Sequence, residues 1–249
     1  MKKVANLSVI VPSLNHGNYL DKCLRSIFED QNYNYQVFLM DGGSNDNTIE
    51  IIENWREKLH FFRSLKDNGQ GAAINEAAQK INTKYLCWLN SDDYFLPNGL
   101  DFMYETIQER DSPVLYCRTY DLIQKNLSFR QTKVENFSKE RLAIRCIISQ
   151  PGSIIKKDCW DKVNGLDQNL KLAFDYDLWW KIFMKYGDLH FIDKFVAVNR
   201  VHFKTKTVIN RKKHYEEAIK IIKKYNKRVP IKWYLYQPYA VWLRLLLKI

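Results

Sequence analysis

The sequence lacks paired cysteines, and this excludes a disulfide-bonded scaffold and a cysteine-based zinc site. Its five cysteines are scattered over 249 residues without a CxxC pair, which is typical of a reducing compartment. No stretch reaches the roughly 18 consecutive apolar residues of a membrane-spanning helix, so we expect none. The first residues reach polar Asn6 without the apolar run of a signal peptide, and we therefore expect a cytoplasmic protein.

The chain also lacks low-complexity tracts and an even spread of charge. Its length and its 46% hydrophobic content allow one large α/β domain with a buried core. Lys and Arg outnumber Asp and Glu by 39 to 28, but eleven basic and only two acidic residues lie in 211–249. The first 210 residues are thus nearly neutral. A nucleic-acid-binding protein more often spreads its basic residues over a recognition surface, so we expect no nucleic-acid partner.

Short apolar runs alternate with amphipathic stretches in the first half of the chain. Residues 7–11 are expected to form a buried strand that Pro12 ends, and three more strands are expected at 36–40, 60–64 and 85–89. Helical patterns lie between these runs. This order predicts an α/β fold with a Rossmann-like, mostly parallel sheet and helices on both faces. Ligands bind such sheets beyond the carboxyl ends of the strands, so polar clusters that follow strands should share one crevice.

The second half of the chain breaks this rhythm. We expect a hairpin at 114–132 and a helix at 138–148, followed by a short strand after Gly152. A second helix is expected from about 175 and a strand at 191–198. We interpret residues 1–210 as one domain, with a nucleotide-binding half to about residue 110 and an acceptor-binding half from about 111. Residues 211–249 are expected to form a basic, aromatic helical tail.

Two polar clusters follow predicted strands. Residues 90–93 offer oxygen ligands for a hard cation such as Mg²⁺ or Mn²⁺, although Asp and Asn also cap loops after strands. Residues 41–48 fit a tight turn with a helix cap, or a site where Asp41 accepts hydrogen bonds from a nucleobase or ribose. The absence of a GxGxxG motif argues against a dinucleotide site.

Two further features allow either a structural or a functional interpretation. Asp175 and Asp177 open an amphipathic helix, where acids cap the helix and offset its dipole; at most one of them should face a crevice. His202 follows an apolar run and precedes Lys206 and Thr207. It is either structural or a ligand of a metal or a diphosphate.

Taken in order, these clusters resemble the family 2 glycosyltransferases, which have the GT-A fold. The resemblance runs from about Leu7 to Thr207. Six segments carry it: SVIVPSLN at 8–15, DGGSND at 41–46, DNGQG at 67–71, WLNSDD at 88–93, FDYDLW at 174–179 and RVH at 200–202. Each alone could arise by chance, but six in the family's order are a strong signal.

The resemblance implies a metal-dependent, inverting glycosyltransferase with a nucleotide-sugar donor. Residues that it places at the nucleotide or donor sugar are Pro12, Asn15, Asp41, Asp67, Gln70, Asn90, Ser91 and Asp93. It makes Asp92 the metal-binding acid, with His202 completing a Mn²⁺ or Mg²⁺ site. Asp175 matches the catalytic base, and Gln150 and Pro151 precede it in the acceptor half.

Three positions depart from the family pattern. Gly42 follows Asp41 where many members have a second acid, and Phe174 stands where an acid often precedes the base. Asn90 replaces a frequent Asp, so the predicted metal site has one charge fewer.

The resemblance also implies partners, with a UDP-sugar as the leading donor and a glycan or lipid-linked glycan as acceptor, in bacterial capsule or O-antigen synthesis. Aromatic and basic residues of the tail, from Trp233 to Leu247, favour a peripheral position on the inner face of the cell membrane; the alternative is a helix packed on the domain itself. A nucleotidyltransferase should carry a glycine-rich basic loop after the first strand, unlike residues 12–18. A non-catalytic sugar-nucleotide-binding protein is the other alternative.

Overall fold

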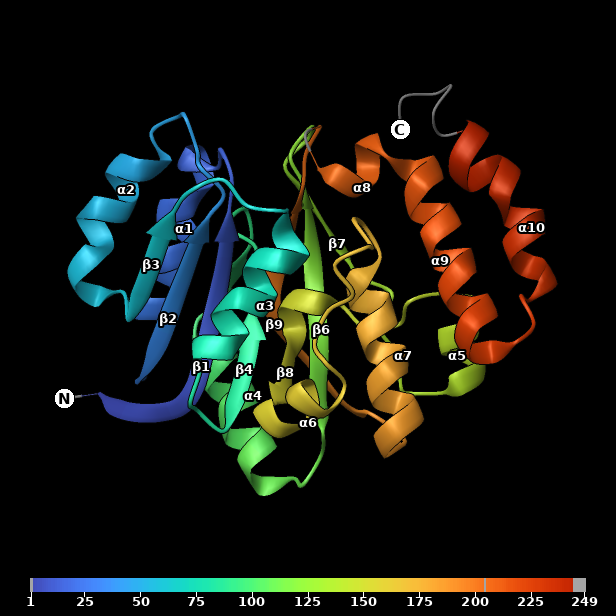
Figure 1. Ribbon diagram of the computed structural model, residues 1–249, viewed down its shortest axis with the longest axis horizontal. Coiled ribbons are helices and arrows are strands. Elements are labelled where there is room, and N and C mark those ends of the chain that lie inside the picture. Colours follow the sequence, from blue (N-terminus) through green and yellow to red (C-terminus); the bar gives the residue numbers. More distant parts are fainter. Residues whose placement is uncertain (1, 204, 244–249) are drawn as a thin grey trace.

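A nine-stranded mixed sheet runs through the centre of the molecule in the computed structural model, which describes residues 2–203 and 205–243 (Figure 1). The strands lie in the order β3-β2-β1-β4-β8-β6-β9-β5, with β7 paired to β6. Their bounds are β1 Lys3–Ser13, β2 Tyr33–Asp41, β3 Phe61–Ser64, β4 Tyr85–Trp88, β5 Tyr94–Phe95, β6 Val114–Ile123, β7 Ser128–Gln131, β8 Ser153–Lys156 and β9 His190–Val201.

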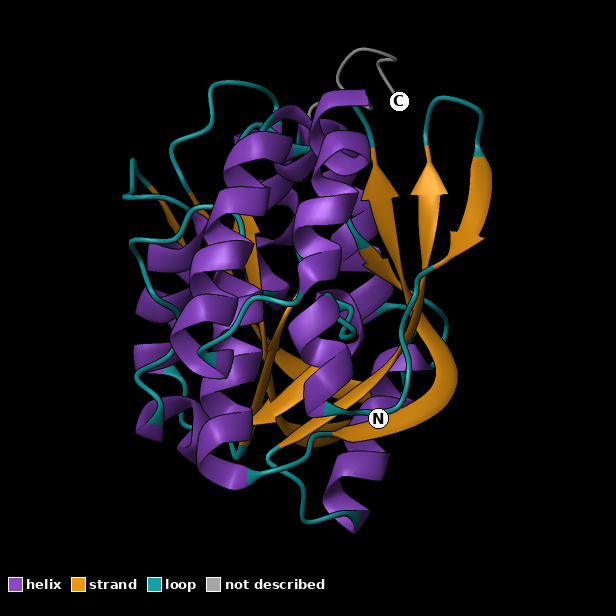
Figure 2. Cartoon of the chain, turned by 90° about the vertical axis from the view of Figure 1, so that its right-hand side faces the viewer, coloured by secondary structure: helices purple, strands orange, loops and turns teal. Residues whose placement is uncertain are grey.

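The two halves of the sheet are built differently. Strands β1, β2, β3 and β4 pair only in parallel with one another, as the alternation of apolar and amphipathic segments predicts. Beyond them β8 is antiparallel to both β4 and β6, whereas β6 and β9 are parallel. The sheet is therefore mixed in the half where the sequence rhythm breaks, and Figure 2 shows how strongly it curves.

Helices cover both faces of this sheet (Figures 1 and 2). Their bounds are α1 Gly17–Phe28, α2 Thr48–Trp55, α3 Gln70–Lys80, α4 Gly99–Glu109, α5 Lys139–Ile144, α6 Lys157–Lys162, α7 Phe174–Tyr186, α8 Lys206–Ile209, α9 Arg211–Asn226 and α10 Ile231–Gln237. Short helical turns are η1 Arg56–Lys58, η2 Gln150–Gly152 and the π-helix η3 Pro238–Leu243.

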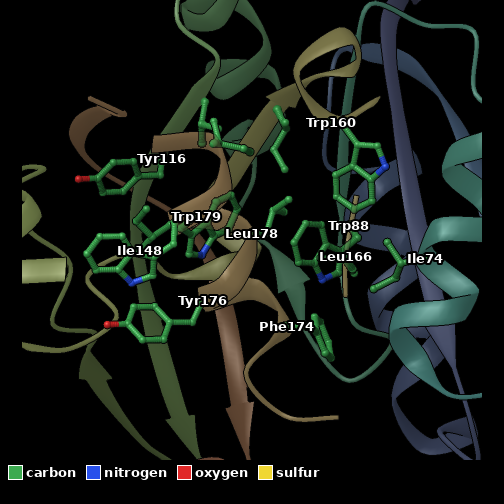
Figure 3. Packing of buried hydrophobic residues seen from close by; sticks show 14 of the residues in the cluster. Ile74, Trp88, Tyr116, Ile148, Trp160, Leu166, Phe174, Tyr176, Leu178 and Trp179 are labelled. Carbon is green, nitrogen blue, oxygen red and sulfur yellow. The ribbon is translucent and has the colours of Figure 1, made fainter. Parts of the chain in front are cut away.

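Alternation along the strands divides the core in two, because successive side chains of a strand point to opposite faces. Val9 and Val11 of β1 pack with α1, α2 and α4, while Ile10 between them packs with α3 and α7. On this second face Trp88 of β4 contacts the rings of Trp160 and Trp179 (Figure 3). Two fully buried faces explain why these strands read as continuous apolar runs.

The first helix of the tail belongs to the core. Ile221 and Ile222 of α9 are buried in the cluster that α7 shares, and the rings of Tyr225 and Trp180 stack with their centroids 5.9 Å apart. Trp233 of α10 donates a hydrogen bond from its indole N–H to the carbonyl of Ala143. Leu245, Leu246 and Leu247, which the tail pattern includes, lie outside the described residues. Among the described residues, no helix has the length and apolar character needed to cross a bilayer.

Several element ends differ from the predictions. Strand β1 continues through Pro12 to Ser13, because Pro12 lies near the end of the strand and its carbonyl still accepts a hydrogen bond from the N–H of Ser91. The helix predicted over 138–148 ends at Ile144. Arg145 is extended there, with φ −166°, and its guanidinium pairs with Glu135.

Candidate active site

Polar loops from both halves of the chain meet beyond the carboxyl ends of β1, β2 and β4. Gly42 N–H donates to the carbonyl of Ser13, which joins the loops after β1 and β2. Arg200 N–H donates to Asp93 at 2.8 Å, which brings the end of β9 to the loop after β4. Residues 107 positions apart are thus hydrogen-bonded at one edge of the sheet, where ligands bind in open α/β folds.

Asp92, His202 and His16 form a cluster at this edge. The Nε2 atom of His202 lies 3.0 Å from one carboxylate oxygen of Asp92, and Nδ1 of His16 lies 4.0 Å from the other. One ligand atom from each residue lies within 4.8 Å of the other two. The ring of Tyr19 stacks on His202 with a centroid distance of 5.2 Å, which fixes the imidazole plane.

The chemistry of this cluster fits a divalent cation. Burial alone would raise the pKa of Asp92, but the hydrogen bond from His202 and the two nearby imidazoles lower it. Burial lowers the pKa of His16, so its imidazole is neutral and able to act as a ligand at pH 7. Two imidazole nitrogens and one carboxylate oxygen leave coordination positions for water or phosphate oxygens. Mg²⁺ is held chiefly by oxygen ligands, whereas imidazole nitrogens suit transition-metal ions.

Asp93 and Asn90 extend the cluster into a chain of hydrogen bonds. Burial and the adjacent charge of Asp92 raise the pKa of Asp93 well above its usual value. The side-chain N–H of Asn90 donates to Asp93, and its amide oxygen accepts from Gln70 at 2.7 Å. An ionised Asp could only accept hydrogen bonds. The amide of Asn90 donates to Asp93 and accepts from Gln70 at the same time. The ionised acid that is frequent in the family could not make both bonds.

The loop after β2 is held by Asp41. This residue is fully buried, and its carboxylate accepts hydrogen bonds from the N–H groups of Gly43 and Ser44 and from the hydroxyls of Ser44 and Ser64. Four donors fill the acceptor capacity of a carboxylate. The side chain of Asp41 thus shapes the turn and is not presented to the crevice, unlike the direct nucleotide contact that the resemblance implies.

Asn15 and Pro12 lie at the carboxyl end of β1. Asn15 is exposed and has a positive φ of 54°, which Asn tolerates better than most residues. Its side-chain oxygen accepts from Asn45 N–H, and its own N–H donates to Ser44. Pro12 is buried beneath this loop, and the buried hydroxyl of Ser91 contacts His16 Nδ1 at 2.8 Å.

The loop after β3 is anchored by a buried guanidinium. Arg63 donates to the carbonyls of Asp41 and Leu65, and it pairs with Glu76 and with Asp67. The other carboxylate oxygen of Asp67 accepts from Gly69 N–H. Asp67 is therefore a support of the loop that starts α3 and leads to Gln70.

Asp175 and Asp177 have different surroundings at the start of α7. Asp177 is almost fully buried and bonded to Lys181, Lys224 and Tyr225, so it is structural. Asp175 forms no ion pair with any described residue, and one of its oxygens accepts from Tyr176 N–H. Burial raises its pKa to about 6, which is suitable for a general base that operates near pH 7.

His16 and Glu217 were missed from the sequence, and Lys206 was noted only as a basic residue that follows His202. His16 directly follows Asn15 in the loop after β1, and this position beyond a strand end was the available signal. Lys206 of α8 donates to the side-chain oxygen of Gln70 at 3.4 Å. Glu217 of α9 accepts hydrogen bonds from the loop that precedes Asp175, and nothing in its local sequence indicates this contact.

The sequence of this chain is similar to those of known glycosyltransferases. Residues 8–159 match the family described as Glycosyl transferase family 2. An uncharacterized glycosyltransferase of Rickettsia typhi is 29% identical over 223 residues, which cover 84% of this chain and 69% of that protein. The chondroitin synthase of Escherichia coli is 25% identical over 244 residues, covering 96% of this chain but 35% of the synthase.

Solved structures match in fold. S. aureus TarS in complex with UDP-GlcNAc has a TM-score of 0.72 at 20% identity, over 92% of this chain and 68% of that one. The mannosyltransferase PcManGT from Pyrobaculum calidifontis, in complex with GDP-Man and Mn²⁺, has a TM-score of 0.70 at 16% identity, over 95% of this chain and 72% of that one. At these identities the likeness establishes the arrangement of the elements.

Proposed function

Because the chain belongs to glycosyltransferase family 2 and has the GT-A fold, we propose that it is an inverting enzyme that transfers a sugar from a nucleotide-sugar donor to a hydroxyl of a glycan or lipid-linked glycan. The observation that carries the proposal is the meeting of Asp92, His202 and His16 beyond the strand ends. The half-buried carboxylate of Asp175, which forms no ion pair with a described residue, lies at the start of α7 in the other half of the domain.

The donor site lies in the loops after β1, β2 and β4. We assign direct donor contacts to Asn15, Gln70 and the backbone of the loop after β2, with supporting roles for Pro12, Asp41, Asp67, Asn90, Ser91 and Asp93. A UDP-sugar is the leading donor of this proposal, and TarS in complex with UDP-GlcNAc is one protein that shares the fold.

Asp92, His202 and His16 would hold Mn²⁺ in this scheme. The bound cation would neutralise charge on the diphosphate and so make the nucleotide a better leaving group. Asp92 supplies the charged ligand, and its lowered pKa keeps it ionised at neutral pH. Burial and the charge of Asp92 raise the pKa of the neighbouring Asp93, so Asp92 is the more acidic of the two carboxyls.

Asp175 is the proposed general base. Its ionised carboxylate accepts the proton of the acceptor hydroxyl while that oxygen attacks the anomeric carbon on the face opposite the nucleotide. The carbon–oxygen bond to the diphosphate breaks as the new glycosidic bond forms, so the configuration inverts. A carboxyl with a pKa of about 6 is a stronger base than an ordinary Asp and is still mostly ionised at pH 7.

We further propose that the predicted catalytic domain, residues 1–210, is completed by α9, whose Ile221 and Ile222 lie in its core, and that α10 attaches it to the cytoplasmic face of an anionic membrane. Trp233 fixes α10 to the domain, while other apolar and aromatic side chains of α10 and η3 are exposed beside Lys232: Ile231, Tyr234, Leu235, Tyr236 and Tyr239. Such a face suits the membrane interface, where a lipid-linked acceptor of polysaccharide synthesis would lie.

The test is a thermal-shift comparison of UDP, GDP, dTDP and CMP with and without Mn²⁺, followed by transfer from the matching sugar nucleotide. We expect a Mn²⁺-dependent rise in Tm with UDP, and a product whose anomeric configuration by NMR is opposite to that of the donor. A product of retained configuration would contradict the single-displacement mechanism. A response to every nucleotide without Mn²⁺ would contradict the metal-linked donor site.

A further inference from the structure

A cavity of about 290 Å³ lies beside the proposed donor site, between the start of α3, the segment before α7 and helices α8 and α9. Its volume is at the lower end of ordinary ligand pockets, about 300–1,000 Å³, and suits one sugar-sized group. The residues that line it are Asn68, Gly69, Gln70, Gly71, Ala72, Gln168, Leu170, Lys171, Leu172, Lys206, Asn210 and Lys213.

The lining of this cavity is basic and contains no acidic side chain. Lys171, Lys206 and Lys213 come from three separate segments, and none of them forms an ion pair with a described residue. Lys171 donates only to the carbonyls of Asn68 and Gln168, both at 3.3 Å. An anion in this cavity would meet three lysine side chains and no carboxylate of the lining residues.

The other lining groups suit a sugar that carries the anion. Four amide side chains, from Asn68, Gln70, Gln168 and Asn210, can both donate to and accept from hydroxyl groups. The N–H groups at the start of α3 have no side-chain cap and add donors to the same wall. Lysine ammonium groups and backbone N–H groups together are common ligands of phosphate.

The cavity adjoins the proposed base as well as the donor site. Gln70 connects it to Asn90 of the donor half. A Cβ placed on Gly71 would lie 3.9 Å from the ring of Phe174, the residue before Asp175. An acceptor held here would thus lie between the donor side and the start of α7.

Building on the proposed function, we propose that this cavity binds a phosphate group of the acceptor, so that the enzyme extends a phosphate-bearing glycan. The phosphate could belong to a lipid diphosphate or to a polyol or sugar phosphate within the chain. Both present the same anion to the three lysines.

The experiment measures binding of glucose 1-phosphate and of geranyl diphosphate by calorimetry, with the full chain saturated by UDP and Mn²⁺. We expect at least one probe to bind while UDP remains bound, and glucose itself to bind about tenfold more weakly or worse. The double variant Lys171→Gln/Lys213→Gln should weaken the probe about tenfold or more and leave UDP binding unchanged, because two charge-assisted contacts are lost. The better-bound probe identifies the source of the phosphate.

Two controls make the result decisive. Lys125→Gln/Lys133→Gln removes the same charge from exposed positions elsewhere and should keep probe binding, as should Lys171→Arg/Lys213→Arg. Competition between the probes and UDP would assign the cavity to the donor diphosphate and overturn the inference. So would undiminished binding in the Gln variant. If the wild type fails to bind UDP with Mn²⁺, the proposed function is at fault, whereas UDP binding without probe binding rejects this inference alone.

Discussion

The carboxylate of Glu217 on α9 accepts a hydrogen bond of 3.0 Å from the backbone N–H of Ala173, two residues before Asp175. The same carboxylate accepts from the N–H groups of Lys171 and Leu172, at 3.2 and 2.9 Å. Glu217 is buried, and of its three donors Ala173 is buried as well. A residue of the basic tail thereby fixes the segment that places the proposed base.

Replacing Glu217 tests this positioning role. Glu217→Ala leaves three N–H groups without this acceptor, and the bond to the N–H of Ala173 is buried, so we expect a loss of stability of about 1–3 kcal/mol and a fall in kcat of about tenfold. Glu217→Gln keeps one acceptor oxygen and should recover part of both, while Glu216→Ala, at the exposed neighbouring position, should change neither. Urea unfolding and a pH–rate profile are the measurements. If Glu217→Ala lowers stability but leaves kcat and the pH profile unchanged, Glu217 has a structural role only.

Ionisation of Asp175 should control the pH dependence of transfer. With its pKa raised to about 6 by burial, kcat/KM should fall as the pH drops from 7 to 5 and level off above 7. Asp175→Asn should reduce transfer by about 10²–10⁴-fold, the usual effect of removing a general base, and leave the binding of UDP with Mn²⁺ intact. A variant of normal activity would exclude Asp175 as the base.

The same carboxyl should reduce stability at neutral pH. A raised folded-state pKa means that its contribution to stability is complete below the unfolded pKa near 3.8 and is lost as the pH rises through about 6. Asp175→Asn removes this loss, so the variant should be more stable than the wild type by roughly 2–3 kcal/mol at pH 8, and by less at pH 5. If the wild type and Asp175→Asn are equally stable to urea at both pH values, burial does not raise the pKa of Asp175.

Mn²⁺ affinity should depend on His16 as well as on Asp92 and His202. We expect His16→Gln to weaken Mn²⁺ binding about tenfold, as measured by electron paramagnetic resonance of the free ion, and Asp92→Ala to weaken it further because the charged ligand is lost. His190→Gln changes a histidine at the other end of β9 and is the matched control. If His16→Gln binds Mn²⁺ as the wild type does, the site has only two protein ligands.

Much of this site could be predicted from order along the chain, because the carboxyl ends of parallel strands must lie at one edge. Asp92 and His202 are 110 residues apart, yet their motifs paired them and the structure places them 3.0 Å apart. His16 was missed because the sequence does not give the direction of a loop side chain. Glu217 was missed because its contact depends on how α9 packs, and the tail's charge pointed instead to a membrane.

The antiparallel position of β8 within the sheet could not be predicted from the sequence either. A short strand was expected after Gly152, but its place between β4 and β6 is set by long-range pairing. Asp41 shows that a motif alone does not tell where a side chain is bonded. Its motif is present, but its carboxylate accepts hydrogen bonds within the turn and from Ser64.

The exposed side of α10 should mediate attachment to anionic vesicles. Leu235 is 72% exposed, and Leu235→Glu places a charge within the aromatic face, so co-sedimentation with phosphatidylglycerol vesicles should fall about tenfold. Leu127→Glu adds the same charge at another exposed leucine and should bind as the wild type does. Binding that survives Leu235→Glu would place the membrane contact elsewhere.

Asn90→Asp separates metal affinity from stability at one position. The change restores the family's frequent acid and adds a negative charge near Asp92, so Mn²⁺ should bind more tightly. It also removes the N–H donor to Asp93 and sets a third carboxyl among two others, so the fold should lose about 1–3 kcal/mol at pH 8. The loss should shrink at pH 5, where protonation relieves the repulsion. If Mn²⁺ binds more tightly and stability is not lost, the hydrogen bonds that join Gln70, Asn90 and Asp93 do not stabilise the fold. The amide at this position then has no structural advantage over an acid.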